Sequence, residues 1–434
     1  MLEITGKFCK DCKIFADTIE EEALQTIYGI CDNQAFKDQK IRIMSDVHQG
    51  KGIVVGFSST LGDYICPSHV GVDIGCQITS IILDKRLEES QYPLFDQRVK
   101  STIPMGFDLR EKTRAIERDL LQLLDQELKT AASSWPEMIE YEKVDQRYLD
   151  KLIKRIGIDP GVFYKSLGTM GGGNHFLEYG EGEEYPCALT IHCGSRNFGL
   201  KVCKYWESIA GKPKIHDTSA YARELDEIRQ NTPNKRDIRK KIDELREKYL
   251  AMSAPSGYLE GDDLKGYLKD MVIAQGYAKY NHQLIKEDLL GIYRKLVQGA
   301  KVIEEIHTIH NYINFQDHII RKGAVQARSG QLLILPFNMR DGLAICKGKG
   351  NKDWNYTCPR GAGRIMSRSK AKERITLKEY KDSMKGIYSS CVNQSTIDES
   401  PMAYKDTEEI INLIEPTVEI LGFIKPQINF KAAE

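Results

Sequence analysis

Two short loops near the start of the chain carry side chains that could bind a metal ion. Asp46 and His48 stand beside a glycine-rich stretch, and Asp73 and Cys76 are three residues apart across a glycine turn. A carboxylate and a thiolate at that spacing can reach one ion as a hard and a soft ligand. On its own, an Asp-x-x-Cys pair is more typical of a turn aspartate and a buried cysteine, so a metal site requires further ligands.

Imidazoles from three later segments supply such ligands. Each stands beside glycines, at the end of a short apolar run or in a stretch of mixed periodicity: His175, His192 and His310. Glycine permits close approach of the backbone to a phosphate or an ion. Imidazole, thiolate and carboxylate together suit a borderline divalent ion. We therefore predict a metal site assembled from several separate loops.

A second constellation could bind phosphate. A tight glycine turn at 361–363 is followed by Arg364 and Arg368, whose spacing of four would place both on one face of a helix. Arg196 and the pair at 321–322 add further cations beside glycine. A glycine turn that leads into a helix N-terminus beside arginines is typical of a phosphate cradle. The alternative is an ordinary solvated helix that begins after a turn.

Length and charge exclude several classes of protein. The chain has 434 residues, 62 Lys+Arg and 62 Asp+Glu, so it can bury a sizeable core and has no global basic field. No run approaches the roughly 20 apolar residues of a membrane span. The N-terminus lacks the pattern of a signal peptide, so we expect a cytoplasmic protein. In that reducing compartment the 11 cysteines are not expected to form a disulfide framework, and Cys9-x-x-Cys12 is interpreted as structural rather than as half of a zinc site.

The elements that would position these residues alternate between helical and strand-rich stretches. Apolar spacing predicts helices over 16–28 and 110–156. Short β-rich runs separated by Gly and Asp occupy 41–83, and buried strands are expected at 187–191 and 331–335. Functional side chains are often found on loops between such strands.

Highly charged helices fill the stretch 206–296. The signs alternate at helical spacing over 236–248, which is typical of a solvated helix with i,i+4 pairs. Strands lie before and after this stretch, and no linker rich in Pro, Gly or Ser separates them. We therefore predict an α+β fold: one mixed domain over 1–434, with 206–296 as a helical insertion.

In this order, the segments resemble the RtcB family of RNA ligases. The resemblance spans essentially the whole chain and rests on many ordered segments rather than on one motif. They are 46–52, 72–76, 171–178, 192–196, 310–311, 321–324, 361–368 and 429–431.

The resemblance implies an activity, a fold and a set of partners. Members of the family join RNA that ends in a 2′,3′-cyclic phosphate or 3′-phosphate to RNA with a 5′-hydroxyl, using GTP and Mn²⁺. Such reactions serve tRNA splicing and RNA repair. The family fold is a single mixed α/β architecture around a β-rich metal cleft. Whether an activating protein partner is needed does not follow from the sequence.

The resemblance also implies roles for individual residues. A centre of two manganese ions bridged by the cysteine thiolate would be held by Asp73, Cys76, His175, His192 and His310, with Cys76 and His192 also counted as catalytic. The nucleotide would be contacted by Asn174, Glu178, Asn311, Gly361, Ala362, Gly363, Arg364, Tyr404 and Lys431. RNA phosphates would be contacted by Arg196, Arg364 and Arg368.

One departure from the family pattern bears directly on the chemistry. In the family that this sequence resembles, the residue directly before the Gly-Ala-Gly-Arg sequence is a histidine, which becomes guanylylated. In this chain that residue is Arg360. A guanidinium stays protonated and has no lone pair with which to attack phosphorus, so Arg360 cannot take that role.

Three interpretations follow from Arg360. In the first, the chain is a ligase or end-processing enzyme in which another residue serves as the nucleophile, or in which the metal centre hydrolyses phosphate ends. Alternatively, it is a ligation-deficient paralogue that binds RNA ends or GTP as a sensor or regulator. The third interpretation is an ordinary ligase in which Arg360 is a variant or engineered residue.

Overall fold

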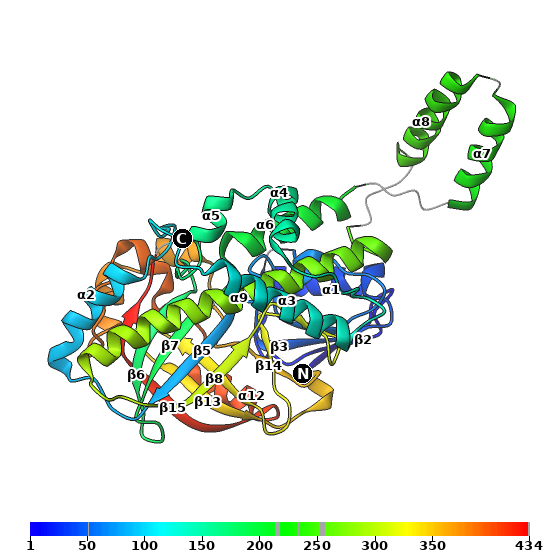
Figure 1. Cartoon of the computed structure of the whole chain (residues 1–434). Coiled ribbons are helices and arrows are strands. Elements are labelled where there is room, and N and C mark those ends of the chain that lie inside the picture. The colour runs from blue at the N-terminus through cyan, green and yellow to red at the C-terminus, as the bar shows by residue number, and fades with distance from the viewer. Residues whose placement is uncertain (51, 213–217, 233, 252–256, 433–434) are drawn as a thin grey trace.

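Two large β-sheets organise the molecule in the computed structural model (Figure 1). The structure describes residues 1–434 except 51, 213–217, 233, 252–256 and 433–434. The first sheet has six strands in the order β1-β2-β3-β4-β10-β9. Its strands are β1 (Leu2–Ile4), β2 (Asp11–Ile14), β3 (Lys40–His48), β4 (Val55–Thr60), β9 (Tyr312–Asn314) and β10 (Ile319–Lys322).

The second sheet has seven strands in the order β12-β13-β15-β6-β7-β5-β8, all paired antiparallel. Its core strands β5 and β7 are buried along their whole length, as expected for strands covered on both faces. The strands are β5 (Gln77–Leu83), β6 (Phe176–Glu181), β7 (Cys187–Cys193), β8 (Val302–Ile309), β12 (Leu332–Asn338), β13 (Gly342–Gly348) and β15 (Val418–Phe430); β11 (Ala324–Gln326) and β14 (Thr357–Pro359) form a separate small pair.

Helices lie over the sheets and at their ends. They are α1 (Glu21–Cys31), α2 (Tyr92–Thr102), α3 (Glu117–Ser134), α4 (Gln146–Ile156), α5 (Pro160–Lys165), α6 (Arg196–Ala210), α7 (Thr218–Asn231), α8 (Lys235–Ala251), α9 (Gly261–Leu296), α10 (Arg368–Arg374), α11 (Leu377–Ser383) and α12 (Thr407–Ile414). Short 3-10 turns are Gln34–Phe36, Pro67–His69, Glu89–Gln91, Lys352–Trp354, Gln394–Glu399 and Pro401–Ala403. The predicted mixed α+β class is confirmed. No described helix has the length and apolar character to cross a membrane.

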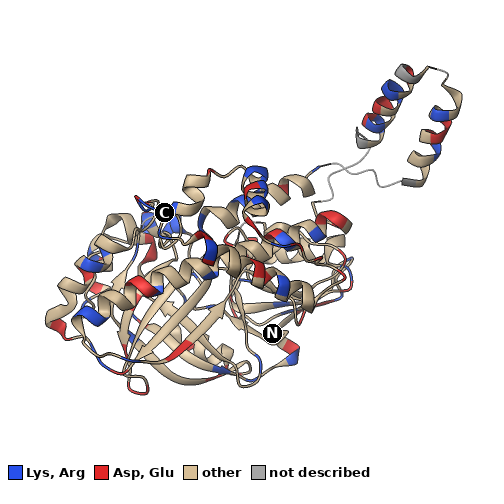
Figure 2. Ribbon diagram, in the orientation of Figure 1, with Lys and Arg blue, Asp and Glu red and all other residues tan. Residues whose placement is uncertain are grey.

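The stretch 206–296 contains two kinds of helix. The 36-residue α9 is extensively buried and packs on α2, α3, α6 and β7. In contrast, α7 and α8 pack on each other and project from the rest of the chain (Figure 1). Both signs of charge are interspersed along α7 and α8 (Figure 2), and most described side chains over 237–249 are exposed. The alternating signs of 236–248 thus do mark a solvated helix, although the side chain of Arg236 lies outside the described residues.

Two helix predictions need correction at their boundaries. The helix expected over 16–28 begins only at Glu21. The helix expected over 110–156 is two helices, because α3 ends before Trp135 and Pro136. A residue before proline is sterically disfavoured in the α region, which accounts for the break there.

Candidate metal and nucleotide cleft

The five predicted metal ligands meet at one end of four neighbouring strands. Asp73 and Cys76 lie in the loop just before β5, and His175 directly precedes β6. His192 is near the end of β7, and His310 follows β8. The strands β6, β7, β5 and β8 are adjacent and antiparallel. The starts of β5 and β6 therefore lie beside the ends of β7 and β8, at one end of the strands.

The predicted ligands form two groups, and Cys76 belongs to both. Its Sγ lies 3.4 Å from Nε2 of His175 and 3.4 Å from Nε2 of His192. One group is Cys76, His192 and His310, and the other is Asp73, Cys76 and His175. Nε2 of His192 is 3.3 Å from Nε2 of His310, and Nε2 of His175 is 2.8 Å from Oδ2 of Asp73. A cysteine sulfur shared by two ligand groups is the arrangement that a bridge between two ions would require.

The protonation and hydrogen bonding of the histidine rings in this cluster bear on whether it can bind a cation. Burial lowers the pKa of His192 and of His310 well below its ordinary value, so both imidazoles are neutral. The Nδ1 atoms of His175, His192 and His310 are buried without a hydrogen-bond partner among the described residues, and the Nε2 atoms converge on one another. At His175 burial is outweighed by Cys76, Cys193 and Asp73, which raise the pKa of this imidazole well above its ordinary value, so an ion would displace a proton there. Imidazole nitrogens, a thiol and a carboxylate in contact are the donor types that a borderline divalent ion prefers.

A cleft of about 740 Å³ opens beside this cluster. It is lined by residues from the first sheet, the second sheet and the segment 360–370. Among the residues expected at the site, its wall includes Asp73, Cys76, Asn174, Glu178, His192, Asn311, Arg360, Gly361, Ala362, Gly363, Arg364, Arg368, Tyr404 and Lys431. This volume and mixed lining are those of a typical ligand pocket.

A buried carboxylate that sequence reasoning missed organises one side of the cleft. Glu399 accepts from Nζ of Lys431 at 2.6 Å and from the Tyr404 hydroxyl at 2.7 Å. Arg364 and Arg368 also pair with it, Arg364 at 3.5 Å. The only signal in the sequence is indirect: a cluster of cations in a protein interior needs a counter-charge.

Glu178, by contrast, is buried with an unsatisfied oxygen. It is 4% exposed, and its Oε1 has no hydrogen-bond partner among the described residues. Burial raises the pKa of Glu178 to about 8, although nearby Lys431 opposes the shift. A buried acceptor without a donor beside a cleft marks a place where a ligand can supply the missing hydrogen bond.

The phosphate cradle expected at 361–368 has a different local structure. Arg364 is extended and forms a β-bridge with Tyr404, and α10 begins only at Arg368. The two arginines therefore do not share a helix face, and that prediction is wrong. They converge instead because both reach Glu399. The two arginines are close together because they share the buried partner Glu399, not because of helical spacing.

A bulge in β3 carries Asp46 and His48 to the cleft. Ile43 pairs with Phe57, and the next pair is His48 with Val55, so extra residues are inserted on the β3 side. Bulges of this kind redirect side chains and are common beside active sites. Asp46 is 1% exposed, and burial raises its pKa to about 6.

Asp46 is the link between β3 and the Arg360 turn. Its Oδ2 accepts from the backbone N–H of Arg360 at 3.2 Å. Gly363 has φ +75°, and a Cβ there would lie 2.6 Å from the Asp46 carbonyl oxygen. The glycine is therefore required both by the left-handed conformation and by close contact with β3.

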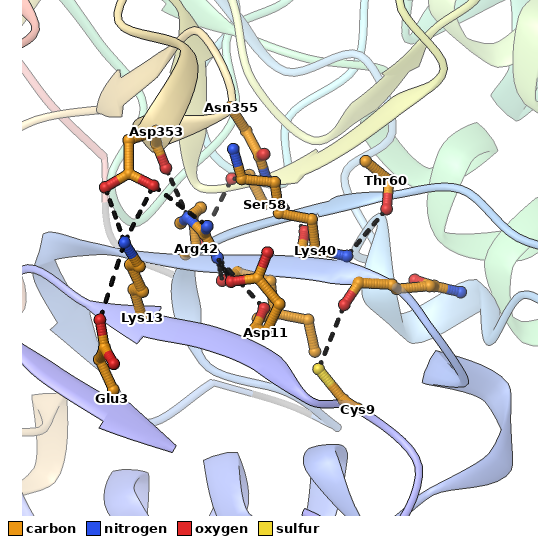
Figure 3. A network of polar contacts seen from close by, with 12 residues as sticks. Glu3, Cys9, Asp11, Lys13, Lys40, Arg42, Ser58, Thr60, Asp353 and Asn355 are labelled. Carbon is orange, nitrogen blue, oxygen red and sulfur yellow. Dashed lines mark hydrogen bonds and ion pairs between the residues drawn. The ribbon is translucent and has the colours of Figure 1, made fainter. Parts of the chain in front are cut away.

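A polar network on the first sheet fixes the loop before Arg360 (Figure 3). Arg42 on β3 is 2% exposed; its Nε donates to the Asp353 carbonyl at 2.5 Å, and its guanidinium pairs with Asp11 at 2.8 Å. Nδ2 of Asn355 donates to the Lys40 carbonyl at 3.0 Å. Because β14 follows this loop and ends directly before Arg360, the network contributes to the position of the turn.

The remaining predicted residues differ in their placement. Asn311 holds the metal loop in place: its Nδ2 donates to the Asp73 carbonyl at 3.2 Å, and its Oδ1 accepts from Gly323 N–H at 2.8 Å. Arg196 lies outside the cleft wall and donates to Thr169 Oγ1 and the Gly106 carbonyl. Lys51, in the segment 46–52, lies outside the described residues.

Comparison with known proteins agrees with this geometry. A family model described as "tRNA-splicing ligase RtcB" matches residues 33–432. The chain belongs to the RtcB family. It is 29% identical to the RNA-splicing ligase RtcB of Escherichia coli strain K12, over 95% of each protein. It is 26% identical to the tRNA-splicing ligase RtcB of Aeropyrum pernix, over 85% of this chain and 82% of that protein.

A eukaryotic relative is similar over a comparable length. The chain is 24% identical to the RNA-splicing ligase RtcB homolog 2 of Entamoeba dispar, over 89% of this chain and 80% of that protein. The family expected from the ordered motifs is thus confirmed, and so is the expected clustering of metal-ligating side chains in a β-rich cleft.

Proposed function

We propose that this chain is an RNA ligase that joins 2′,3′-cyclic phosphate or 3′-phosphate ends to 5′-hydroxyl ends with GTP and Mn²⁺. The observation that carries the proposal is the pair of ligand groups sharing Cys76 at the edge of a cleft. Family membership supports it, as do relatives named RNA-splicing and tRNA-splicing ligases. We further propose that the protein acts in the cytoplasm.

Two manganese ions would be held by the two groups. Asp73, Cys76 and His175 would bind one, and Cys76, His192 and His310 the other, with the thiolate shared. When bound, such ions neutralise phosphate charge and act as Lewis acids. The chain itself would orient the ligands, since Asn311 fixes the backbone at Asp73.

The nucleotide would occupy the part of the cleft between Glu178 and the glycine turn. The unsatisfied carboxyl of Glu178 would pair with N–H groups of guanine, beside Tyr404 and Lys431. Asn174 and the backbone at 361–363 would contact phosphate. Arg364 and Arg368 would hold RNA or GTP phosphates at the cleft wall, whereas Arg196 would act from outside it.

We also propose that 1–434 form a single catalytic domain with 206–296 as a helical insertion. The projecting helices α7 and α8 are the part of this insertion that lies apart from both sheets. RNA with the stated ends and GTP would be the partners of this domain.

One residue favours a second function. Arg360 lines the cleft where the family has its guanylylated histidine, and a guanidinium cannot attack GTP. A ligation-deficient protein would keep the metal and nucleotide residues, bind RNA ends or GTP, and leave the ends unjoined. An intermediate case would only hydrolyse phosphate ends.

A two-strand RNA assay separates these functions. Purified protein is incubated with Mn²⁺, GTP and two labelled RNAs, one ending in a 3′-phosphate or cyclic phosphate and one starting with a 5′-hydroxyl. A joined product that Cys76→Ala abolishes and Cys346→Ala retains supports the ligase, because Cys346 is buried in β13 away from the cluster. Binding of RNA ends or GTP without joining supports the sensor, and phosphate release without joining supports hydrolysis.

A further inference from the structure

We propose that His48 is the residue of this chain that accepts the guanylyl group, in the place of the histidine that Arg360 has replaced. The inference rests on the proposed ligase function and names its missing nucleophile. It is carried by the position of His48 in the cleft wall and by the hydrogen bond that fixes its ring.

His48 is set apart from the other imidazoles of the cleft. Among the described residues that line the cleft, the histidines are His48 and His192. His192 contacts Cys76 and His310 and belongs to a metal group, so its lone pair is committed when an ion binds. His48 belongs to neither group.

The ring of His48 is held in the tautomer that a nucleophile needs. Its Nδ1 lies 2.8 Å from the carbonyl oxygen of Asp46. A carbonyl only accepts, so Nδ1 carries the proton and donates, and the lone pair is on Nε2. His48 lines the cleft and is partly exposed, so a ligand can reach the ring.

The same aspartate connects His48 to the turn where the family nucleophile stands. Asp46 accepts from the His48 ring through its carbonyl and from the Arg360 N–H through its carboxylate. Gly363 packs on the same carbonyl. His48 therefore lies beside the turn in which residue 360 stands.

Burial, with a smaller contribution from nearby cations, keeps the His48 imidazole neutral. Burial lowers the pKa of His48 to about 4, against the Asp46 carbonyl, which favours the protonated ring. Three cations face it from neighbouring segments and lower the pKa further: Arg360, Arg364 and Lys405. At neutral pH the Nε2 lone pair is thus available, and the same cations favour approach of a triphosphate.

Transfer of the guanylyl group to His48 consumes one nucleoside triphosphate. The Nε2 lone pair forms a bond to the α-phosphorus of GTP, and the bond from that phosphorus to the oxygen bridging to the β-phosphate breaks. Pyrophosphate leaves with the electron pair, and Nδ1 keeps its proton. An oxygen of the RNA 3′-phosphate then bonds to the same phosphorus, the P–N bond breaks, and neutral His48 is restored.

Adduct mapping tests this assignment. The protein is incubated with Mn²⁺ and GTP labelled at the α-phosphate, and the labelled peptide is identified by mass spectrometry. We expect the label on His48, labile in acid and stable in alkali as a phosphoramidate. His48→Asn should reduce labelling at least 100-fold, while His307→Asn, on the exposed face of β8, should label normally. Titration with Mn²⁺ should show unchanged metal binding in both variants.

The double variant His48→Asn with Arg360→His makes the result decisive. It places an imidazole where the family has one, so recovery of the adduct at position 360 shows that loss in His48→Asn is not loss of folding. An adduct on another residue, or full labelling of His48→Asn, overturns the inference. If the double variant labels and ligates while the natural chain never labels, His48 fails but the family chemistry stands. If no form labels or ligates, the proposed function fails as well.

Discussion

Nζ of Lys431 lies 2.6 Å from Oε2 of Glu399, and the two side chains are 5% and 2% exposed. Burial alone would raise the pKa of Glu399, yet Lys431, Arg368 and Arg364 outweigh it and lower that pKa to about 2. The carboxylate is therefore ionised at neutral pH and holds three cations in one wall of the cleft. Removing one member of such a cluster leaves buried charge uncompensated.

Glu399→Gln should destabilise the protein by about 3–5 kcal/mol, because Lys431 would lose its buried counter-charge. Urea unfolding followed by circular dichroism measures the difference. Glu373→Gln, at an exposed position of α10, is the matched control and should stay within about 0.5 kcal/mol of the natural chain. Equal stability of the two variants would contradict a stabilising role for the cluster.

Acid should weaken the contribution of Glu399. Because its pKa falls from 4.5 to about 2 on folding, the ionised carboxylate stabilises the protein above pH 4.5. That stability is lost as the pH falls from 4.5 through 2. The unfolding free energy of Glu399→Gln should therefore approach that of the natural chain over this window. A constant difference across the window would count against the lowered pKa.

Glu178 should show the opposite dependence on pH. Its pKa rises from 4.5 to about 8 on folding, so the folded chain binds the proton more tightly. Stability should fall as the pH rises from 4.5 to 8, and level off above 8. Glu178→Gln removes the titration and should gain stability relative to the natural chain across this window. Denaturant midpoints measured at pH 5, 7 and 9 provide the test, and parallel pH profiles would contradict it.

The five side chains of the candidate metal cluster could be predicted from the sequence because they stand in recognisable local patterns. Asp73 and Cys76 share one turn, and His192 ends an apolar run that becomes β7. The order of the segments then identified the family. What joins them in space, the adjacency of β6, β7, β5 and β8, is a long-range pairing that no local pattern encodes.

Residues with purely tertiary roles escaped prediction. Glu399 lies in a short 3-10 segment without any motif, and its importance comes from cations up to 35 positions away. Arg364 and Arg368 were expected on one helix face, but Arg364 lies in a β-bridge, bends follow at 365–366, and α10 begins only at Arg368. Spacing of four predicts a shared face only where a helix forms, and here the bridge to Tyr404 prevents it.

Cys76 belongs to both candidate ligand groups, so the proposed metal site predicts unequal effects of its variants on metal binding. Cys76→Ala should weaken both ions, since both groups contain this thiol. His175→Ala should weaken one and leave Cys76, His192 and His310 for the other. Titration of Mn²⁺ followed by the signal of the free ion should therefore give about two, one and no tightly bound ions for the natural chain, His175→Ala and Cys76→Ala.

Thermal shifts provide an independent readout of the same variants. Free Mn²⁺ at 100 times its dissociation constant should add about 2.7 kcal/mol of stability per site. The gain should be smallest in Cys76→Ala and unchanged in Cys346→Ala, whose thiol is buried elsewhere. Retention of two tight ions by Cys76→Ala would argue against a bridging thiolate.

Gly363 allows the strain of the turn to be separated from its contact with β3. Gly363 and Gly386 both have positive φ, at +75° and +89°, so alanine at either should cost about 1–2 kcal/mol from backbone conformation. Only at Gly363 would the new Cβ meet an atom, the Asp46 carbonyl oxygen at 2.6 Å, whereas nothing lies within 4 Å at Gly386. Gly363→Ala should therefore lose about a further 1–3 kcal/mol and bind GTP more weakly, because the turn must move away from Asp46. Gly386→Ala should bind GTP normally. Unfolding and fluorescent-nucleotide titration measure both effects, and equal losses in the two variants would mean that the turn is not held against β3.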